Sequence, residues 1–522
     1  MVLNLLSSLP AACNFTRLSL PLSSKVNGFV PPITRVQYHM AASTTPIKPA
    51  DQTIIRRSAD YGPTIWSFDY IQSLDSKYKG ESYAKQLEKP KEQVSAMLQQ
   101  DDKVVDLDPL HQLDILSLED EIKRTLDRIH NKNTNKSLYA TALKFRVLRQ
   151  YETFSRFMDE KGRFKSSGHS DDGKGMLALS IFRDATSFTT AYLKEWVIKH
   201  DSNKNDDEHL CTLVNHALEL PLHWRMLRLE ARWFIDVYEN GPDMNPILLE
   251  LAKVDFNIVQ AVHQENLKYA SRWWKKTGLG GENLNFVRDR IVENFFWSVG
   301  EKFEPQFGYF RRMSTMVNAL ITAIDDVYDV YGTLEELEIF TDAVERWDAT
   351  AVEQLPHYMK LCFHALRNSI NEMTFDVLRD QGVDILISYL KKWADICKAY
   401  LVEAKWYNSG YMPTLQEYMK NAWISIGATV ILVHAYTFTA NPITKEGVEF
   451  VKDYPNIIRW SSVILRFADD LGTSLDELKR GDVHKSIQCH MHEAGVSEGE
   501  AREHINDLET HISFPTFLLG LQ

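Results

Sequence analysis

Apolar residues recur at three- and four-residue steps along almost the whole chain from about residue 65 onward. The pattern is clearest in PLHQLDILSLEDEIKRTLDRI (109–129) and PILLELAKVDFNIVQAVHQENLKYASRWW (246–274). This spacing places the apolar side chains on one face of an α-helix. No stretch shows the sustained alternation, bounded by turns, that strands require. The sequence therefore predicts an all-α protein.

The chain is long enough for more than one helical domain. It has 522 residues, 44% of them hydrophobic, which can bury a large core and suggests two or more domains. The segment ENGPDMNP (239–246) is rich in Gly, Pro and Asn and interrupts two long helical patterns. We expect an N-terminal helical domain over residues 51–240 and a C-terminal domain over residues 241–522. No short-period repeat is present, so a regular solenoid is not expected.

Residues 1–50 differ in composition from everything after them. They contain no Asp or Glu, are rich in Ser and Thr, and carry four basic residues: Arg17, Lys25, Arg35 and Lys48. This composition is typical of an organelle transit peptide. It predicts a plastid or mitochondrial location, the alternative being a disordered N-terminus.

Charge and cysteine usage exclude several partners and sites. The formal charge of −12 argues against nucleic acid or an anionic membrane as the main partner. The most apolar segment, ISIGATVILVHAYTFTA (424–440), is short, carries His434 and stops at Asn441-Pro442, which favours a buried core helix. The five cysteines are scattered without a CxxC pair, so we expect neither a zinc site nor a disulfide framework.

Three acids follow an apolar run in NALITAIDDVYDVYG (318–332). Asp325 and Asp329 are four residues apart and share one helix face, with Asp326 beside them. Carboxylates crowded so closely repel each other unless a cation holds them. Magnesium takes oxygen ligands and typically combines one or two carboxylates with a substrate phosphate. The alternative interpretation is an ordinary solvated acidic helix end.

A second set of oxygen groups lies in FADDLGTSLDELKRGD (467–482). Asp469, Thr473 and Glu477 stand at i, i+4 and i+8, so they line one stripe over about two helical turns. This arrangement also suits magnesium. A capping or salt-bridge cluster with Lys479 and Arg480 is the alternative.

Cations and aromatic residues accompany these acids. Arginine forks suit phosphate oxygens and lysine adds a point charge; the candidates are Arg288, Arg290, Arg466 and Lys485. Two metal-binding stripes with such cations predict a diphosphate site. Nearby aromatic residues could exclude water and stabilise a carbocation through their ring faces, although each could also be simple core; they are Phe295, Phe296, Trp297 and Tyr328.

In combination, DDVYD, DDLGTSLDE, RDR and RRSADYGPTIW resemble the plant class I terpene synthases. The last motif, in which eight residues separate Arg56-Arg57 from Trp66, is typical of the angiosperm monoterpene synthase branch. The resemblance covers about residues 54–505. It implies an N-terminal α-barrel-like domain and a C-terminal class I terpenoid synthase helical bundle that holds the active site.

The resemblance also implies roles for individual residues. The metal ligands would be Asp325, Asp326, Asp329, Asp469, Thr473 and Glu477. The substrate-binding residues would be Arg288, Asp325, Asp329, Arg466 and Asp469. The departing diphosphate would be gripped by Arg288, Arg290, Arg466 and Lys485. Trp297 matches an aromatic residue that faces the cation, and Asn318 matches a position that tunes the product. Arg56 and Arg57 match a pair used in isomerising and cyclising geranyl diphosphate.

The implied reaction is magnesium-dependent loss of diphosphate from geranyl diphosphate. Three Mg²⁺ ions are expected with substrate, and Mn²⁺ is expected to substitute for them. The allylic cation would be recaptured as linalyl diphosphate, close to an α-terpinyl cation, and end as a limonene-, terpineol- or cineole-type product. Such an enzyme is a lyase, and we expect a monomer in the plastid stroma without nucleic-acid or membrane partners. No class II DxDD motif is present, so protonation-initiated cyclisation is not expected.

Three places depart from the family pattern. After GVSEGEAREHI the family continues through further helices and a lid loop, which we expect this chain to lack. The segments LRQYETFSRF (148–157) and GMLALSIFRDA (175–185) are shorter than the pattern. A catalytically impaired enzyme or a helical scaffold therefore stays an alternative. Two further alternatives are other enzymes. One is a sesquiterpene synthase acting on farnesyl diphosphate, and the other is a chain-elongating prenyltransferase, which would repeat DDxxD.

Overall fold

The computed structural model describes residues 56–59, 61–100, 107–131, 187–199, 208–220, 225–281, 284–480 and 483–519. Within these ranges the regular structure is helical and no strand occurs, so the all-α prediction is confirmed for the described residues. The predicted transit peptide (1–50) and the two shortened segments (148–157 and 175–185) lie outside these ranges.

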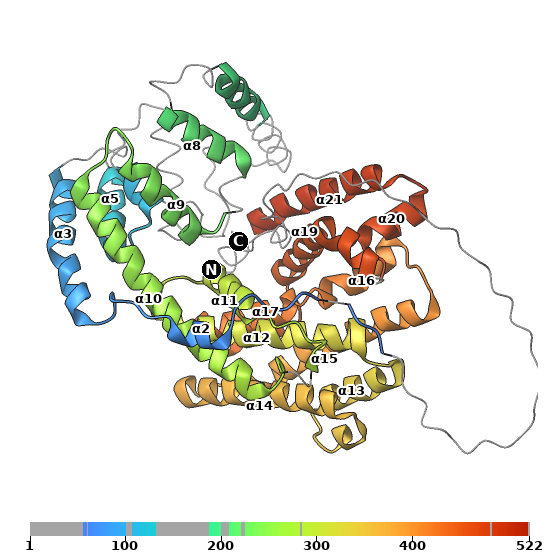
Figure 1. The fold of residues 1–522 in the computed structure, drawn as a ribbon. Helices are drawn as coiled ribbons and strands as arrows, with labels where there is room; N and C mark the ends of the chain where they lie inside the picture. Colours follow the sequence, from blue (N-terminus) through green and yellow to red (C-terminus); the bar gives the residue numbers. More distant parts are fainter. Residues whose placement is uncertain are drawn as a thin grey trace, which may run out of the picture.

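One group of helices comes from the N-terminal half and gathers on one side of the molecule (Figure 1). Its members are α3 (Glu81–Gln100), α4 (Leu107–Leu113), η2 (Leu116–Leu118), α5 (Glu119–Asn131), α8 (Glu208–Glu219) and α9 (Leu227–Glu239). The short helix α2 (Phe68–Ser73) lies apart from them against α10 (Pro246–Thr277), and its Ile71 belongs to the core of the C-terminal half. Helices α3, α4, α5 and α9 share an apolar core that includes Val94, Leu110, Ile122 and Phe234. This core is separate from the larger one in the C-terminal half.

The long helix α10 (Pro246–Thr277) joins the two cores. It begins where the side chain of Asn245 accepts hydrogen bonds from the backbone N–H of Ile247 (3.0 Å) and Leu248 (3.3 Å). Its first turns pack on α3 and α9, and its later turns pack on α11 and α12. The helix break predicted at 239–246 is present, but α10 contributes to both cores. The domain boundary at residues 240/241 stays a prediction.

The second group of helices follows α10. It comprises α11 (Ile291–Glu301), η6 (Pro305–Phe307), α12 (Gly308–Asp326), η7 (Val327–Tyr331), α13 (Leu334–Arg346), η8 (Ala351–Gln354), α14 (His357–Gln381), α15 (Leu386–Ser409), α16 (Leu415–Ser425), α17 (Ala428–Thr439), α18 (Lys445–Lys452), α19 (Asn456–Arg480), α20 (Ser486–Ala494) and α21 (Glu498–Leu519). Helix α12 packs against α10, α11, α14 and α17, so it occupies the middle of this bundle (Figure 1).

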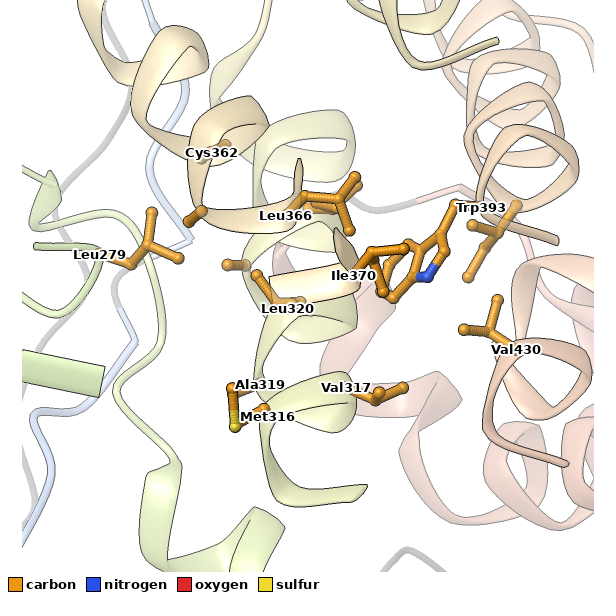
Figure 2. Packing of buried hydrophobic residues seen from close by; sticks show 14 of the residues in the cluster. Leu279, Met316, Val317, Ala319, Leu320, Cys362, Leu366, Ile370, Trp393 and Val430 are labelled. Carbon is orange, nitrogen blue, oxygen red and sulfur yellow. The ribbon is translucent and has the colours of Figure 1, made fainter. Parts of the chain in front are cut away.

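The core around α12 explains why this helix is so apolar. Figure 2 shows Leu320 of α12 facing Leu366 and Ile370 of α14, with Trp393 of α15 and Val430 of α17 on the far side. All five side chains are at most 1% exposed. Dense packing on several sides fixes the position of α12 and of the acids that follow it.

The most apolar segment lies inside the same bundle. Residues Leu415–Thr439 are long and apolar enough to span a membrane, and 61% of their most apolar window is buried within the protein. The segment is broken into α16 and α17 at Gly427, whose φ of 80° suits glycine. The ring of His434 is buried and stacks on Tyr389 at 3.8 Å between centroids. These contacts agree with the predicted core helix.

Candidate active site

The first acidic motif spans the end of α12 and a wider turn. Asp325 and Asp326 are the last residues of α12, and Asp329 lies in the π-helical turn η7. The turn is closed by the N–H of Gly332, which donates to the carbonyl of Val327 at 2.8 Å. Such wide turns often occur at functional sites because they redirect side chains at a helix end.

Arg288 binds both neighbouring aspartates. Its Nη2 lies 2.5 Å from Oδ2 of Asp325, and its Nε lies 2.7 Å from Oδ1 of Asp326. The backbone N–H of Arg288 also donates to Oδ2 of Asp326 at 2.7 Å. Asp325 keeps 27% of its side chain exposed, whereas Asp326 is fully buried. Burial raises the pKa of Asp326 to about 7, although the charge of Arg288 opposes this shift.

The second motif repeats this arrangement on α19. Arg466 forms ion pairs with Asp469 and with Oδ1 of Asp470, the latter at 2.7 Å. Asp469 is 19% exposed and Asp470 is fully buried. Asp470 also accepts the hydroxyl of Tyr418 (3.1 Å) and the N–H of Ser486 (3.0 Å). In both motifs, the first aspartate is accessible and the second holds an arginine.

The remaining groups of the second motif follow along α19. Thr473 lies one turn after Asp469 and donates to its backbone carbonyl at 2.8 Å. Glu477 follows one turn later, with Oε2 at 4.0 Å from Nζ of the buried Lys485. Burial alone would lower the pKa of Lys485, but Glu477 and other acids raise it above its ordinary value. The lysine is therefore charged at neutral pH.

The two motifs face each other across α15. Asp325 and Asp329 both act electrostatically on the buried hydroxyl of Tyr400. Glu403, one turn further along α15, has a pKa raised by burial, lowered by Lys485 and raised again by Asp325. Since such influence requires proximity, α12 and α19 direct their acids toward one shared region. The sequence predicted that the two acidic motifs would serve one diphosphate site. Their common influence on α15 agrees with this prediction.

The acids do not form a metal cage by themselves. Among the described residues, no three acidic, histidine or cysteine side chains come together closely enough to hold an ion. Asp325 and Asp469 are instead paired with arginines. Magnesium usually retains water and shares its ligands with a substrate phosphate, so the donor set fits an ion that arrives with its substrate.

The N-terminal segment before α2 lies against the same region (Figure 1). Arg56 forms two hydrogen bonds of 2.8 Å with Glu336, and its guanidinium lies over the rings of Tyr331 and Tyr358. Burial alone would raise the pKa of Glu336, but the hydrogen bonds, chiefly those from Arg56, lower it to about 2. Arg57 donates to the backbone carbonyl of Asp329 at 2.8 Å.

The same segment contacts both arginines of the RDR motif. Arg290 donates to the carbonyl of Gly62 at 2.8 Å, and the guanidinium of Arg288 lies 4.8 Å from the ring centroid of Tyr61. Trp297 lies on α11, partly exposed, and the buried Asn318 lies on α12 two turns before Asp325. The structure thus gathers the predicted cations around the acids and ties the N-terminal segment to them.

Several residues of this region were not predicted. Asp470, Glu403, Tyr418, Tyr61 and Glu336 all contact or influence the predicted groups. Asp470 could have been found, because it repeats the position of Asp326 in a second Asp-Asp pair. The others depend on contacts between distant segments, for which a single sequence carries no signal.

Comparison with known proteins identifies the chain. Residues 275–512 match the metal binding domain of the terpene synthase family, and residues 65–218 match the terpene synthase N-terminal domain. The chain therefore belongs to the terpene synthase family. The expected two-domain, all-α class I terpenoid synthase fold is confirmed, and so is the expectation that the chain is a lyase.

The individual relatives belong to the monoterpene branch. The chain is 78% identical to the chloroplastic gamma-terpinene synthase of Citrus limon, over 97% of this chain and 90% of that protein. It is 52% identical to the (−)-alpha-terpineol synthase of Vitis vinifera, over 97% of this chain and 88% of that protein. A solved limonene synthase with 2-fluorolinalyl diphosphate has a TM-score of 0.77 and 41% identity, covering 88% of this chain and 89% of that one.

Proposed function

We propose that this monoterpene synthase removes diphosphate from geranyl diphosphate and closes the carbon chain into a cyclic monoterpene. The observation that carries the proposal is the convergence of two arginine–aspartate groups across α15. The relatives that make gamma-terpinene and alpha-terpineol, and the limonene synthase bound to a linalyl diphosphate analogue, support the substrate and the cyclic product.

Magnesium would be held by the accessible oxygen groups of both motifs. We assign this role to Asp325, Asp329, Asp469, Thr473 and Glu477. When bound, the ions supply Lewis-acid stabilisation of the negative charge that develops on the leaving diphosphate. The poplar isoprene synthase, 38% identical with a TM-score of 0.71 over 87% of this chain and 89% of that one, holds three Mg²⁺ ions and a thiolodiphosphate. We extend the same number to this enzyme, with Mn²⁺ as a substitute.

Asp326 has a different role in this proposal. Its carboxylate is fully buried and already binds the side chain and backbone of Arg288. A group in that position orients the arginine and has no free face for an ion. We therefore assign Asp326 to holding Arg288, in place of the metal ligation expected from the motif.

The cations would bind the diphosphate oxygens. Arg288 and Arg466 now neutralise Asp325 and Asp469, and they are placed to turn toward the substrate once those carboxylates have another partner. Lys485 is buried and charged, and Arg290 is held by the N-terminal segment. Preorganised cations stabilise the leaving group without reorganisation during the reaction.

The remaining predicted residues would stabilise the carbocation and shield it from water. Linalyl diphosphate would form by recapture and would then lose its diphosphate again, and the resulting allylic cation would close to the α-terpinyl cation. Trp297 would present a ring face to that cation, and Asn318 would influence how it is quenched. Arg56 and Arg57 would act by holding the N-terminal segment over the site, which excludes water during isomerisation and cyclisation.

We place the enzyme in the plastid stroma as a monomer. Chloroplastic names among the relatives support a plastid location, in agreement with the composition of residues 1–50. Residues 51–240 would form the N-terminal domain and residues 241–522 the catalytic domain.

The test is to incubate the full chain with geranyl diphosphate and Mg²⁺ and to measure diphosphate release and volatile products. We expect stoichiometric diphosphate and cyclic monoterpenes, both lost when a chelator removes the metal. The proposal is wrong if no diphosphate appears. Volatile products formed only from farnesyl diphosphate would instead identify a sesquiterpene synthase.

A further inference from the structure

Helix α21, the last helix that the structure describes, packs along the helix that carries the second acidic motif (Figure 1). Its Ala501 and Ile505 are fully buried, and they share an apolar core with Val463 and Phe467 of α19 and with Ile487 of α20. The predicted groups of the second motif lie on α19 and at the start of α20. Helix α21 therefore forms the outer support of both elements, although it carries no predicted site residue itself.

One polar side chain of α21 reaches the backbone of α19. Nη1 of Arg502 donates to the carbonyl of Leu471 at 2.8 Å, and its Nη2 donates to Oγ of Ser474 at 3.3 Å. Its Nε donates to Oε1 of Glu498, one turn earlier on α21, at 2.7 Å. Each nitrogen of the guanidinium thus has a partner, and Ser474 is only 1% exposed. A planar guanidinium held at three points is a rigid link between the two helices.

These contacts lie on the back of the predicted metal-binding stripe. Leu471 is two residues from Asp469 and two from Thr473, so it lies about 160–200° away from both around the helix. Ser474 is three residues after Leu471 and lies near it on the helix surface. Arg502 therefore holds the middle of the motif from behind and leaves the stripe itself directed toward the site.

The shape of this stretch of α19 decides whether the stripe can hold an ion. Magnesium requires near-ideal octahedral geometry with oxygens at about 2.0–2.1 Å. The hydroxyl of Thr473 donates to the carbonyl of Asp469 at 2.8 Å, and back-bonding of this kind often bends a helix. The bond from Arg502 to the carbonyl of Leu471 acts on the opposite side of the same turn. The two contacts together fix the curvature between Asp469 and Glu477.

We propose that Arg502 is a positioning residue for magnesium, because it sets the curvature of α19 at which the oxygen groups of the second motif can share an ion. This inference rests on the proposed function and deepens it. Arg502 touches neither the ion nor the substrate in this proposal, and it acts through the backbone of α19. Helix α21 thereby gains a part in the reaction that its sequence does not indicate.

A pure charge effect of Arg502 would have the opposite sign. A cation near a metal site repels the ion, so its removal strengthens metal binding. Loss of positioning instead weakens metal binding, because the oxygen groups no longer hold the required spacing. A merely structural role would lower the stability of the protein and leave its dependence on Mg²⁺ unchanged. The direction in which the Mg²⁺ requirement moves therefore separates the three possibilities.

The experiment measures diphosphate release from geranyl diphosphate over a range of Mg²⁺ concentrations. In Arg502→Ala the Mg²⁺ concentration for half-maximal release should rise about tenfold, the lower end of the loss seen when groups that orient metal ligands are removed. Release at saturating Mg²⁺ should stay within about threefold of wild type. Arg502→Lys keeps the charge but cannot reproduce the planar fork, so it should keep most of this increase.

Two further readouts do not depend on turnover. In Arg502→Ala without ligands, the amides of residues 471–477 should exchange hydrogen faster, whereas those of residues 316–324 on α12 should not change. The rise in melting temperature with Mg²⁺ and inorganic diphosphate should also be smaller than in wild type. Ser474→Ala removes one of the two contacts with α19, so it should raise the Mg²⁺ requirement about twofold even if Arg502→Ala folds poorly.

Lys479→Ala is the matched control. Lys479 is an exposed cation on α19, two residues after Glu477, and it pairs with Asp476 at 2.9 Å. Its removal should leave the Mg²⁺ requirement unchanged. The proposal is overturned if Arg502→Ala needs no more Mg²⁺ than wild type, or if Arg502→Lys behaves as wild type. A wild type that releases no diphosphate would instead refute the proposed function, and the exchange and melting measurements would still test Arg502.

Discussion

At the scale of single residues, the two acidic motifs share one design. Each begins with a partly exposed aspartate, Asp325 or Asp469, followed by a fully buried one, Asp326 or Asp470. The buried aspartate fixes an arginine, and the exposed one neutralises the same arginine. An accessible carboxylate can change partners at low energetic cost, whereas a buried one cannot.

Replacing Asp325 with Ala should abolish ionisation. The variant loses an accessible carboxylate of the first motif and leaves Arg288 without its exposed partner. We expect diphosphate release to fall at least about 100-fold, the usual loss when a group that stabilises developing charge is removed. The measurement is single-turnover diphosphate release. Asp342→Ala, at an exposed aspartate of α13 paired with Arg346, serves as the control and should keep full activity. Unchanged turnover in Asp325→Ala would contradict the metal assignment.

Replacing Asp470 with Asn should weaken both the fold and diphosphate binding. The variant removes the charge that faces Arg466 and disturbs the contact with Ser486, next to Lys485. Breaking a buried pair typically costs about 3–5 kcal/mol, so the urea midpoint should fall and the KM for the substrate should rise. Tyr418→Phe removes the hydroxyl that donates to both carboxylate oxygens of Asp470 and keeps the ion pair, so it should cost only about 1 kcal/mol. If both variants showed the same urea midpoint and the same KM, Asp470 would not act by holding Arg466.

Glu301 should make stability depend on pH. Its pKa is raised from 4.5 to about 7, so the folded state holds this proton more tightly than the unfolded chain. The stabilisation is complete below pH 4.5 and is lost as pH rises through 7. At about 1.4 kcal/mol per pKa unit, wild type should lose up to about 3 kcal/mol that Glu301→Gln does not lose. Urea unfolding of both proteins at pH 5 and pH 8 measures this difference in the free energy of unfolding. If the free energy changed equally with pH in both proteins, Glu301 would not be the cause.

At the scale of elements, the described parts of the N-terminal segment, residues 56–59 and 61–67, act as a strap. Arg56 fixes one end to Glu336 at the start of α13, while Tyr61 and Gly62 touch Arg288 and Arg290. The strap therefore connects α13 with the RDR motif, although it comes from the opposite end of the chain. Its position depends on these few contacts, so a single substitution at one of them should loosen it.

Replacing Arg56 with Ala should release the strap. The forked pair with Glu336 and the two ring contacts together contribute about 2–3 kcal/mol. We expect faster hydrogen exchange around residues 288–291 and about tenfold lower turnover, with more acyclic product because water enters. Lys79→Ala, at a partly exposed lysine that pairs with Asp75 and Glu265, is the control. Unchanged exchange around Arg288 would show that Arg56 does not hold the strap.

At the scale of the whole molecule, the sequence predicted local features well and long-range ones poorly. Helical periodicity predicted the class, and the Gly- and Pro-rich break predicted the gap between α9 and α10. Spacing alone placed Asp469, Thr473 and Glu477 on one helix stripe. These features depend on residues close together in the chain.

Other features depend on tertiary packing. Glu403 lies between both motifs only because α15 packs against η7 and α16. The link between Arg56 and Glu336 spans 280 positions of sequence. The wide turn that carries Asp329 replaces the regular helix that a four-residue spacing suggests. None of these contacts has a local pattern, so the sequence could indicate the acids but not their partners.

The exchange of partners across the whole site leads to a last prediction. In the structure, arginines and aspartates neutralise each other at both motifs, so Mg²⁺ alone must displace arginines and diphosphate alone must displace aspartates. When both are present, each group gains a new partner, and the two ligands should bind cooperatively. The melting temperature should therefore rise by a few degrees with Mg²⁺ and inorganic diphosphate together, which corresponds to about 2.7 kcal/mol at a hundredfold excess over Kd. Each ligand alone should give less than half of this shift, and Asp325→Ala should lose the cooperative part. Strictly additive shifts, measured by thermal unfolding over a grid of both concentrations, would show that the arginines and aspartates do not exchange partners.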